Sequence, residues 1–248
     1  ELYGRGVRNF VVEAIPENWA TLYPNSNFLK VVGTLEALQR LAERHRDEFL
    51  IPIIGITGSN GKTMVKEWLY QLLSPEMIVT RSPRSYNSQI GVPLSVWLLN
   101  ENTQIGVFEA GISKPGEMLA LRDIIQPTIG VFTSLGTAHQ ENFPSLEAKC
   151  LEKLKLFHDT QAIVYSEDDQ VLNDCISSKN YKGESLNWSA KDVHAAFFIK
   201  SIEKKDIETT VSYVWKKKVE GQYKLPFIDD ASVEKSITCA VVSLHLGI

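Results

Sequence analysis

Cysteine is scarce in this chain, and its spacing suggests neither a disulfide framework nor a metal site. The 248 residues include three cysteines, Cys150, Cys175 and Cys239. An odd number of widely separated cysteines cannot pair completely, and these lack the close spacing that is typical of zinc sites. We therefore interpret them as reduced thiols and predict a cytoplasmic protein.

The chain also lacks an excess of basic residues and a long apolar run. Its formal net charge is −4 and its pI is about 5.8, so it has no cationic footprint for nucleic acid. No apolar stretch approaches the ~20 residues that span a bilayer, so we predict no membrane span. With 44% apolar and 23% charged residues, the composition is that of an ordinary globular chain.

The most informative segment present is Ile-Ile-Gly-Ile-Thr-Gly-Ser-Asn-Gly-Lys-Thr at residues 53–63. Its apolar start predicts a buried parallel strand over residues 51–57. The residues after it predict an amphipathic helix over residues 62–73, whose inward side chains are Val65, Trp68, Leu69 and Leu72. A helix N-terminus offers unpaired N–H groups, and glycines let backbone approach phosphate oxygens. This order of strand, turn and helix therefore indicates a nucleoside triphosphate site.

The predicted nucleotide contacts are Gly58, Ser59, Asn60, Gly61, Lys62 and Thr63. In such a loop the lysine reaches the β- and γ-phosphates and the following threonine ligates Mg²⁺. The segment departs from the usual G-x-x-x-x-G-K-[ST] pattern, because Ile56 stands where that pattern has its first glycine. The alternative is an ordinary turn between a strand and a helix, with a solvated Lys62.

From Leu50 onward, strand-like and helix-like segments alternate, which predicts an α/β fold with a parallel sheet covered on both faces. The predicted strands are 51–57, 77–81, 104–110, 128–133 and 161–165, and the predicted helices are 62–73, 90–99, 115–125, 145–158 and 168–178. Residues 194–228 change to an alternating pattern that predicts antiparallel strands.

Residues 1–50 resemble the end of a small α/β unit. They contain a predicted strand at 7–12 and a predicted helix at 34–47, with Thr34 as its cap. The inward side chains of this helix are predicted to be Leu35, Leu38, Leu41 and Ala42. The chain starts at Glu1 without Met and stops inside an apolar helical pattern that begins near Ser232, so we expect a fragment of a longer protein.

Two polar residues follow strands of the predicted sheet. In open α/β sheets ligands bind beyond the carboxyl ends of the strands. Glu109 ends one strand, and a carboxylate there is well placed to ligate Mg²⁺. The alternative is a carboxylate that simply leaves the sheet for solvent. His139 follows another strand, and on position alone a loop histidine is more often polar surface.

Lys153 lies on the apolar side of its predicted helix. With Leu146 at 0° and about 100° per residue, Lys153 falls at about −20°, next to Phe157 at about 20°. A buried ammonium is costly unless it is paired or neutralised. Lys153 therefore either extends past the edge of the core or belongs to a site.

The phosphate loop and several later segments resemble the Mur ligase family, in particular its MurF branch. The resemblance rests on Thr57–Thr63, on Tyr-Asn-Ser-Gln-Ile-Gly-Val-Pro at 86–93, on Phe-Glu-Ala-Gly at 108–111 with Gly-Glu-Met at 116–118, and on Gly-Thr-Ala-His at 136–139. It is strongest between residues 53 and 157 and extends from about Tyr3 to the C-terminus.

The resemblance implies an ATP-dependent ligase that adds D-alanyl-D-alanine to UDP-N-acetylmuramoyl-tripeptide through an acyl phosphate. ATP and Mg²⁺ are the implied cofactors, and Lys62, His139 and Lys153 the implied catalytic residues. Thr63, Glu109, His139 and Lys153 are the implied metal ligands. Lys153 follows His139 by fourteen residues, the spacing at which these enzymes carry a carbamylated lysine. Asn87 and Ser88 are the predicted substrate contacts, although their segment also fits a plain connection.

The same resemblance predicts the domains and leaves several alternatives open. Residues 1–50 would end the N-terminal substrate domain and residues 51–248 would form the ATP-binding domain, truncated at its end and inactive alone. Lys235 stands where the family has an asparagine that contacts adenine, which puts that contact in doubt. We expect a monomer unless the natural chain is fused to an oligomeric domain such as alanine racemase. The rivals are a folylpolyglutamate synthase, another Mur ligase, and a nucleotide switch without ligase chemistry.

Overall fold

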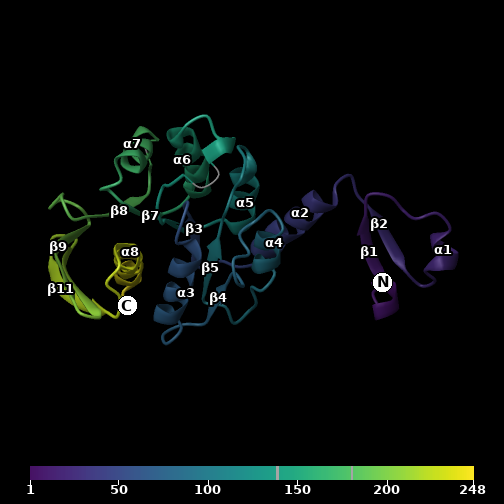
Figure 1. Ribbon diagram of the computed structural model, residues 1–248. Coiled ribbons are helices and arrows are strands. Elements are labelled where there is room, and N and C mark those ends of the chain that lie inside the picture. The colour runs from purple at the N-terminus through teal and green to yellow at the C-terminus, as the bar shows by residue number, and fades with distance from the viewer. Residues whose placement is uncertain (138–139, 180) are drawn as a thin grey trace.

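The computed structural model describes residues 1–137, 140–179 and 181–248. It is a mixed α/β structure with a mostly parallel central sheet, as the alternating sequence pattern predicts. Figure 1 shows a small N-terminal unit joined by helix α2 to a large body that holds the sheet. Among the described residues, no helix is both long and apolar enough to cross a membrane.

The N-terminal unit is built on two short parallel strands, β1 (Asn9–Val12) and β2 (Asn27–Lys30). The one-turn helix α1 (Trp19–Leu22) lies between them in sequence. The rings of Phe10 and Phe28 stack with their centroids 5.1 Å apart, which holds the two strands together. The strand predicted over residues 7–12 contains β1, whereas β2 and α1 were not predicted.

Helix α2 (Thr34–Arg46) connects the unit to the body and packs through its C-terminal half. Ala42 is fully buried, and the buried Arg46 guanidinium donates to the carbonyl of Ile125 at 3.0 Å. Two predictions here were wrong. Leu35 and Leu41 are exposed, because the helix meets the body along a narrow stripe, and the cap position is Gly33 rather than Thr34. Thr34 opens the helix, and its backbone N–H donates to Glu13 at 2.9 Å.

Within the described residues, the central sheet has nine strands in the order β11-β10-β9-β8-β7-β6-β3-β5-β4. Its parallel part runs from β4 to β9, and β9, β10 and β11 pair antiparallel. The strands are β3 (Ile53–Thr57), β4 (Val79–Arg81), β5 (Ile105–Glu109), β6 (Ile129–Phe132), β7 (Ala162–Ser166), β8 (Glu184–Ser189), β9 (Phe197–Lys205), β10 (Glu208–Trp215) and β11 (Val219–Leu225). The antiparallel strands predicted within 194–228 are confirmed, whereas β8 was not predicted.

Helices cover both faces of the sheet. They are α3 (Lys62–Leu73), α4 (Gly91–Val96), α5 (Glu117–Ile125), α6 (Leu146–Leu154), α7 (Gln170–Ser178) and α8 (Asp230–Leu246). The predicted bounds of α3 are confirmed to the residue. The helix predicted at 145–158 is α-helical to Leu154 and continues as a 3-10 turn over Lys155–Phe157.

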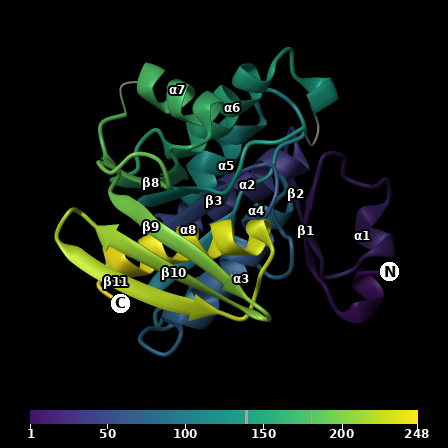
Figure 2. The same cartoon turned by 60° about the vertical axis from the view of Figure 1, so that its left-hand side comes forward.

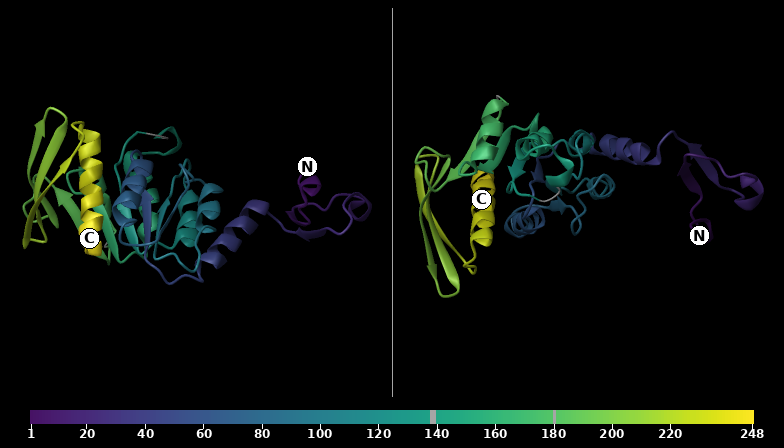
Figure 3. Two further views of the ribbon diagram at one scale, coloured as in Figure 1. Left: turned by 90° about the horizontal axis from the view of Figure 1, so that it is seen from below. Right: turned by 45° about the horizontal axis from the view of Figure 1, so that its top comes forward.

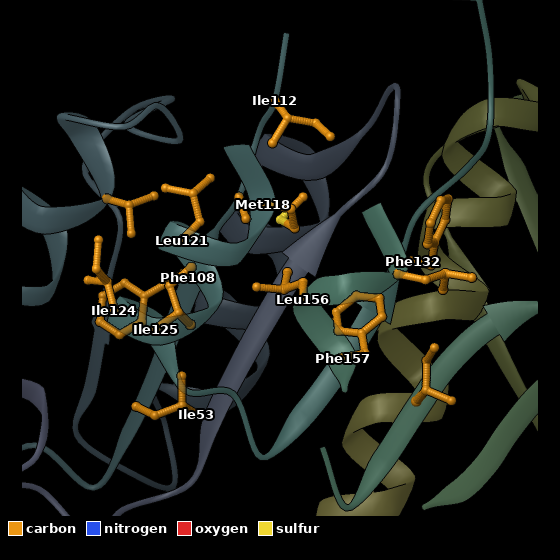
Figure 4. Packing of buried hydrophobic residues seen from close by; sticks show 14 of the residues in the cluster. Ile53, Phe108, Ile112, Met118, Leu121, Ile124, Ile125, Phe132, Leu156 and Phe157 are labelled. Carbon is orange, nitrogen blue, oxygen red and sulfur yellow. The ribbon is translucent and has the colours of Figure 1, made fainter. Parts of the chain in front are cut away.

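Alternate residues of the buried strands point into two separate cores. Ile53, Phe108 and Phe132 join the core that packs against α5 and α6, as the close view in Figure 4 shows. Ile54 and Val131 join the core beneath α3 and α8. This period of two is what a sheet covered on both faces requires.

Helix α8 lies between α3 and the antiparallel extension formed by β9, β10 and β11 (Figures 2 and 3). The Trp68 ring on α3 stacks on Phe227 with centroids 5.2 Å apart, which fastens the end of the extension to the body. Leu72 was predicted to face inward, but 46% of its surface is exposed. The inward face of α3 is instead completed by Lys66 and Leu73.

Candidate active site

The turn between β3 and α3 is built on two glycines with positive φ. Gly58 has φ +140° and Gly61 has φ +79°. A Cβ at Gly58 would lie 2.1 Å from Thr133 Oγ1, and one at Gly61 would lie 2.5 Å from Lys235 Cε. At Gly58 both the backbone conformation and the close packing therefore require glycine. At Gly61 the positive φ favours glycine, whereas the end of the Lys235 side chain could move aside.

The segment after β6 fixes the far side of this turn. The Ser59 N–H donates to the Ser134 carbonyl at 2.8 Å, and the Gly136 N–H donates to Ser59 Oγ at 2.9 Å. Thr133 Oγ1 donates to the Asn60 carbonyl at 2.5 Å. Ser59 and Asn60, both predicted nucleotide contacts, thus hold the loop in place before any ligand binds.

Lys62 folds back over the loop as the first residue of α3. Its Nζ donates to the Gly58 carbonyl at 2.8 Å and contacts the Ser59 carbonyl at 3.4 Å. Burial lowers the pKa of Lys62, and the nearby Glu109 partly offsets this shift. The ammonium therefore sits at the loop with its charge balanced mainly by carbonyl dipoles.

The structure brings the predicted metal ligands Thr63 and Glu109 together. Thr63 Oγ1 lies 3.0 Å from Glu109 Oε2 and 3.1 Å from Ser85 Oγ. The Asn87 side-chain amide lies 3.4 Å from the same Glu109 oxygen. Glu109 has no exposed surface, so the idea that its carboxylate leaves the sheet for solvent is wrong. Its position at the end of β5, beside β3, places it next to the loop.

Lys153 also contacts the loop between β3 and α3. Its side chain is 4% exposed, and Nζ donates to the Gly58 carbonyl at 3.2 Å. Burial lowers its pKa to about 7, and the charges of Lys62 and Lys149 act in the same direction. The inward orientation predicted from its helical angle is confirmed.

Several lysines gather at this end of the sheet. Those that are nearly or fully buried are Lys66, Lys149, Lys153 and Lys235, and Lys62 is partly buried. Among the described residues, Glu109 is the one acidic side chain with no exposed surface. Lys66 pairs with Glu67 and Glu109, and Lys235 pairs with Glu234. Lys62 and Lys153 instead donate to backbone carbonyls of the loop that the sequence marks for phosphate.

The predicted substrate residues share a cavity with the loop lysines. A cavity of about 150 Å³ is lined by Asn87, Ser88, Gly58, Ser59, Lys62, Gly111, Ile112, Ser113 and Lys153. A larger, mainly apolar hollow of about 580 Å³ lies between α3, α8 and β11, and its lining includes none of these residues. We assign the site to the smaller cavity because the charged groups converge there.

Sequence reasoning missed Lys66, Lys149 and Ser85. A signal existed for Lys66, which lies about 100° around the helix from Val65 and close to the buried Leu73 at about 80°. Lys149 donates to the Gly136 carbonyl, a contact that depends on the tertiary fold. His139 lies outside the described residues, so its role stays a prediction.

Comparison with known proteins identifies the family of the chain. The Mur ligase middle domain matches residues 56–242, and the chain belongs to the Mur ligase family. The UDP-N-acetylmuramoyl-tripeptide–D-alanyl-D-alanine ligase of Borreliella burgdorferi is 31% identical over 250 residues, which cover 98% of this chain and 52% of that protein. The ligase of the same name from Bacillus subtilis is 31% identical over 201 residues, covering 76% and 42%.

Solved structures support the same fold. MurF from Acinetobacter baumannii superposes with a TM-score of 0.84 at 22% identity, covering 96% of this chain and 51% of that one. MurF ligase from Thermotoga maritima in complex with ADP gives a TM-score of 0.82 at 24% identity, covering 96% and 54%. The chain thus spans about half the length of the relatives it matches.

Proposed function

We propose that this chain is the ATP-binding part of a ligase that joins D-alanyl-D-alanine to UDP-N-acetylmuramoyl-tripeptide. The observation that carries the proposal is the convergence of Lys62 and Lys153 on the Gly58 carbonyl, 2.8 and 3.2 Å away. Both lysines line the cavity that Asn87 and Ser88 also line. The names of the curated relatives supply the substrates.

The loop residues 58–63 hold the phosphates of ATP in this proposal. The N–H groups of residues 60–63, at the N-terminus of α3, face the phosphate oxygens, and Lys62 moves from the Gly58 carbonyl to the β- and γ-phosphates. Because its ammonium is already in the loop, little reorganisation is needed when charge develops on the γ-phosphoryl group.

Thr63 and Glu109 fit a Mg²⁺ site. Their oxygens are 3.0 Å apart, and a hydroxyl with one carboxylate is a common protein share of a magnesium site that phosphate and water complete. No cluster of three or more His, Cys, Asp or Glu that could hold a metal occurs among the described residues, which agrees with such a shared site. Bound Mg²⁺ would neutralise charge on the phosphates during transfer.

The reaction proceeds by carboxylate activation. The terminal carboxylate of the tripeptide attacks the γ-phosphorus, and ADP leaves with the bond electrons. The amine of D-alanyl-D-alanine then attacks the acyl carbon, phosphate leaves, and the amine loses a proton to solvent. Asn87 and Ser88 orient the tripeptide at the cavity, and Lys62 stabilises the transferred group.

Lys153 carries a carbamate in this proposal, as the family resemblance implies. A carbamate forms when the neutral amine attacks CO₂ and releases a proton. The lowered pKa, about 7, makes the neutral amine abundant at physiological pH. Carbamylation turns a buried cation into an anion that can ligate Mg²⁺. His139 remains a predicted metal ligand or phosphate contact.

Replacing Lys62 tests the phosphate site. We expect Lys62→Ala to lower ATP-dependent ligation by the full-length enzyme by about 10²- to 10³-fold with an unchanged thermal midpoint. Lys182→Ala, at an exposed lysine, is the matched control and should change neither quantity. Near-normal turnover in folded Lys62→Ala would refute the phosphate-loop assignment.

Amine-dependent phosphate release tests the substrate. With UDP-N-acetylmuramoyl-tripeptide and ATP present, D-alanyl-D-alanine should release phosphate and glutamate should not. The fold alone does not separate these, since a folylpolyglutamate synthase of L. casei superposes with a TM-score of 0.65 at 12% identity. Release with glutamate and a folate would favour that rival.

We further propose a cytoplasmic enzyme, because ATP and nucleotide-linked precursors are its substrates. We also propose a monomer, unless the chain is fused to an oligomeric domain.

A further inference from the structure

Lys66 is a fully buried cation for which the mechanism above has no use. It lies one helical turn after Lys62 on α3 and has 0% exposed surface. Its place among the largest fully buried side chains of the molecule is unusual for lysine, which is almost never fully buried unless it is paired. Its partners therefore indicate its role.

The Lys66 ammonium contacts both the proposed metal carboxylate and a neighbouring loop. Nζ lies 3.1 Å from Glu109 Oε1 and 3.0 Å from Glu67 Oε1, and it donates to the Arg84 carbonyl. The other Glu109 oxygen, Oε2, faces Thr63 and Asn87. Lys66 thus holds one carboxylate oxygen and leaves the second turned toward the phosphate loop.

The loop that Lys66 holds is the one that leads to the cavity. Arg84 has φ +47°, a left-handed conformation that a non-glycine residue seldom adopts without support. Ser85, which follows it, contacts Thr63 at 3.1 Å. Two residues further, the Asn87 carbonyl accepts from the Gly111 N–H at 2.8 Å. The Arg84 carbonyl is therefore the point where α3 fixes the start of the segment that carries Asn87 and Ser88.

We propose that Lys66 is a positioning residue that couples the metal carboxylate Glu109 to the loop of residues 82–88. One ammonium fixes the orientation of Glu109 and the strained backbone at Arg84, so that Thr63, Glu109 and Asn87 converge on one point. An apolar side chain of the same length could fill the space but could hold neither oxygen. This inference rests on the proposed function for the role of Glu109, whereas its effect on the loop stands without it.

Lys66→Met in the full-length enzyme tests the coupling through two readings. We expect amide hydrogen exchange at Tyr86 and Asn87 to accelerate at least tenfold, because their turn loses its anchor. We also expect the Mg²⁺ concentration for half-maximal ligation to rise about 10- to 100-fold, the usual cost of removing a partner that orients a metal ligand. Binding of ATP without Mg²⁺ should not change.

Two further variants make the result specific. Glu67→Gln removes the partly exposed partner of Lys66 but leaves the contacts with Glu109 and Arg84, so both readings should stay near those of the wild type. Lys66→Gln keeps an N–H donor without the charge, so loop exchange should change less than in Lys66→Met while the Mg²⁺ requirement still rises. If Lys66→Met does not fold, Lys66→Gln supplies the Mg²⁺ reading.

The outcomes separate this inference from the proposed function. One contrary result is a folded Lys66 variant with unchanged loop exchange and an unchanged Mg²⁺ requirement while Lys62→Ala is inactive. That result would overturn the coupling by Lys66 and leave the proposed function standing. Faster loop exchange in Lys66→Met together with normal ligation by Lys62→Ala would overturn the proposed function, while the anchoring of the loop by Lys66 would be supported.

Discussion

The lysines of the antiparallel extension and those of the phosphate loop have opposite surroundings. On the extension, Lys200 pairs with Glu220 at 2.9 Å and Lys224 with Glu208 at 2.7 Å, and all four side chains are substantially exposed. Around the loop, Lys153 donates to a backbone carbonyl and is 4% exposed. Exposed pairs contribute little to stability, whereas buried cations without acidic partners are costly. The difference supports the proposal that Lys62 and Lys153 serve a site rather than the stability of the fold.

The largest expected effect is the loss of ligation when Lys153 is replaced. Lys153→Ala should lower ligation by the full-length enzyme by about 10³-fold, a large electrostatic contribution, and acetate should partly restore it by occupying the vacated space. Labelling of the Mg²⁺-bound enzyme with ¹³CO₂ should give a carbamate signal that Lys153→Ala lacks. Lys224→Ala, on the extension, should keep full activity. Absence of the signal together with retained turnover would make Lys153 a residue of the core edge.

A smaller effect, on the free energy of unfolding, is expected when Gly58 is replaced. Gly58→Ala should lower the free energy of unfolding by about 3 kcal/mol or more, because it adds backbone strain to a steric clash. Gly116→Ala is the matched control, since Gly116 also has positive φ but no atom lies within 4 Å of its added Cβ. It should cost about 1 kcal/mol. The free energy of unfolding is measured by chemical denaturation. An equal loss in the two variants would show that the close packing at Gly58 contributes nothing.

The next effect concerns Glu109, the proposed metal carboxylate. Glu109→Ala should raise the Mg²⁺ concentration for half-maximal activity by about 10- to 100-fold, and His139→Ala should change it in the same direction. Glu208→Ala, which removes an exposed partner on the extension, should have no effect. A metal requirement that stays the same in both site variants would remove Glu109 and His139 from the metal site.

The last prediction concerns the dependence of stability on pH. Folding lowers the pKa of Lys153 to about 7 from its ordinary value of 10.5, so the unfolded chain binds more protons between these values. Its contribution to stability therefore rises with pH from about 7 to 10.5, by at most about 1.4 kcal/mol per pH unit. In CO₂-free buffer, Lys153→Met should show a flatter rise in stability between pH 7 and 9, whereas Lys224→Met should match the wild type. A parallel rise in Lys153→Met would mean that its pKa is ordinary.

The regular parts of the fold could be predicted from the sequence, and the partners of buried charges could not. Helix α3 was predicted to the residue because a buried strand, two glycines and an apolar period mark its start. Strand β8 was missed because Glu184–Ser189 pairs in the sheet with a mixed burial pattern. Leu35 and Leu41 were misplaced because the sequence does not show how much of α2 meets the body.

The candidate site likewise contains residues that the sequence could predict and residues that it could not. Thr63 and Glu109 follow from the order of strands and loops, and Lys153 follows from its helical angle. The helical angle of Lys66 could have predicted its burial, but its partners and those of Ser85 depend on a loop whose path no local pattern specifies. Their contacts with Glu109 and Thr63 arise only when β5 and α3 are assembled.

The most direct test of the central claim is amide hydrogen exchange of the full-length protein with and without Mg²⁺ and ATP. The account predicts that ATP slows exchange of the backbone N–H groups of residues 58–63 at least tenfold and leaves the extension, residues 197–225, unchanged. Slowed exchange on the extension without any change at residues 58–63 would contradict it, because the buried lysines would then surround a loop that does not hold the nucleotide.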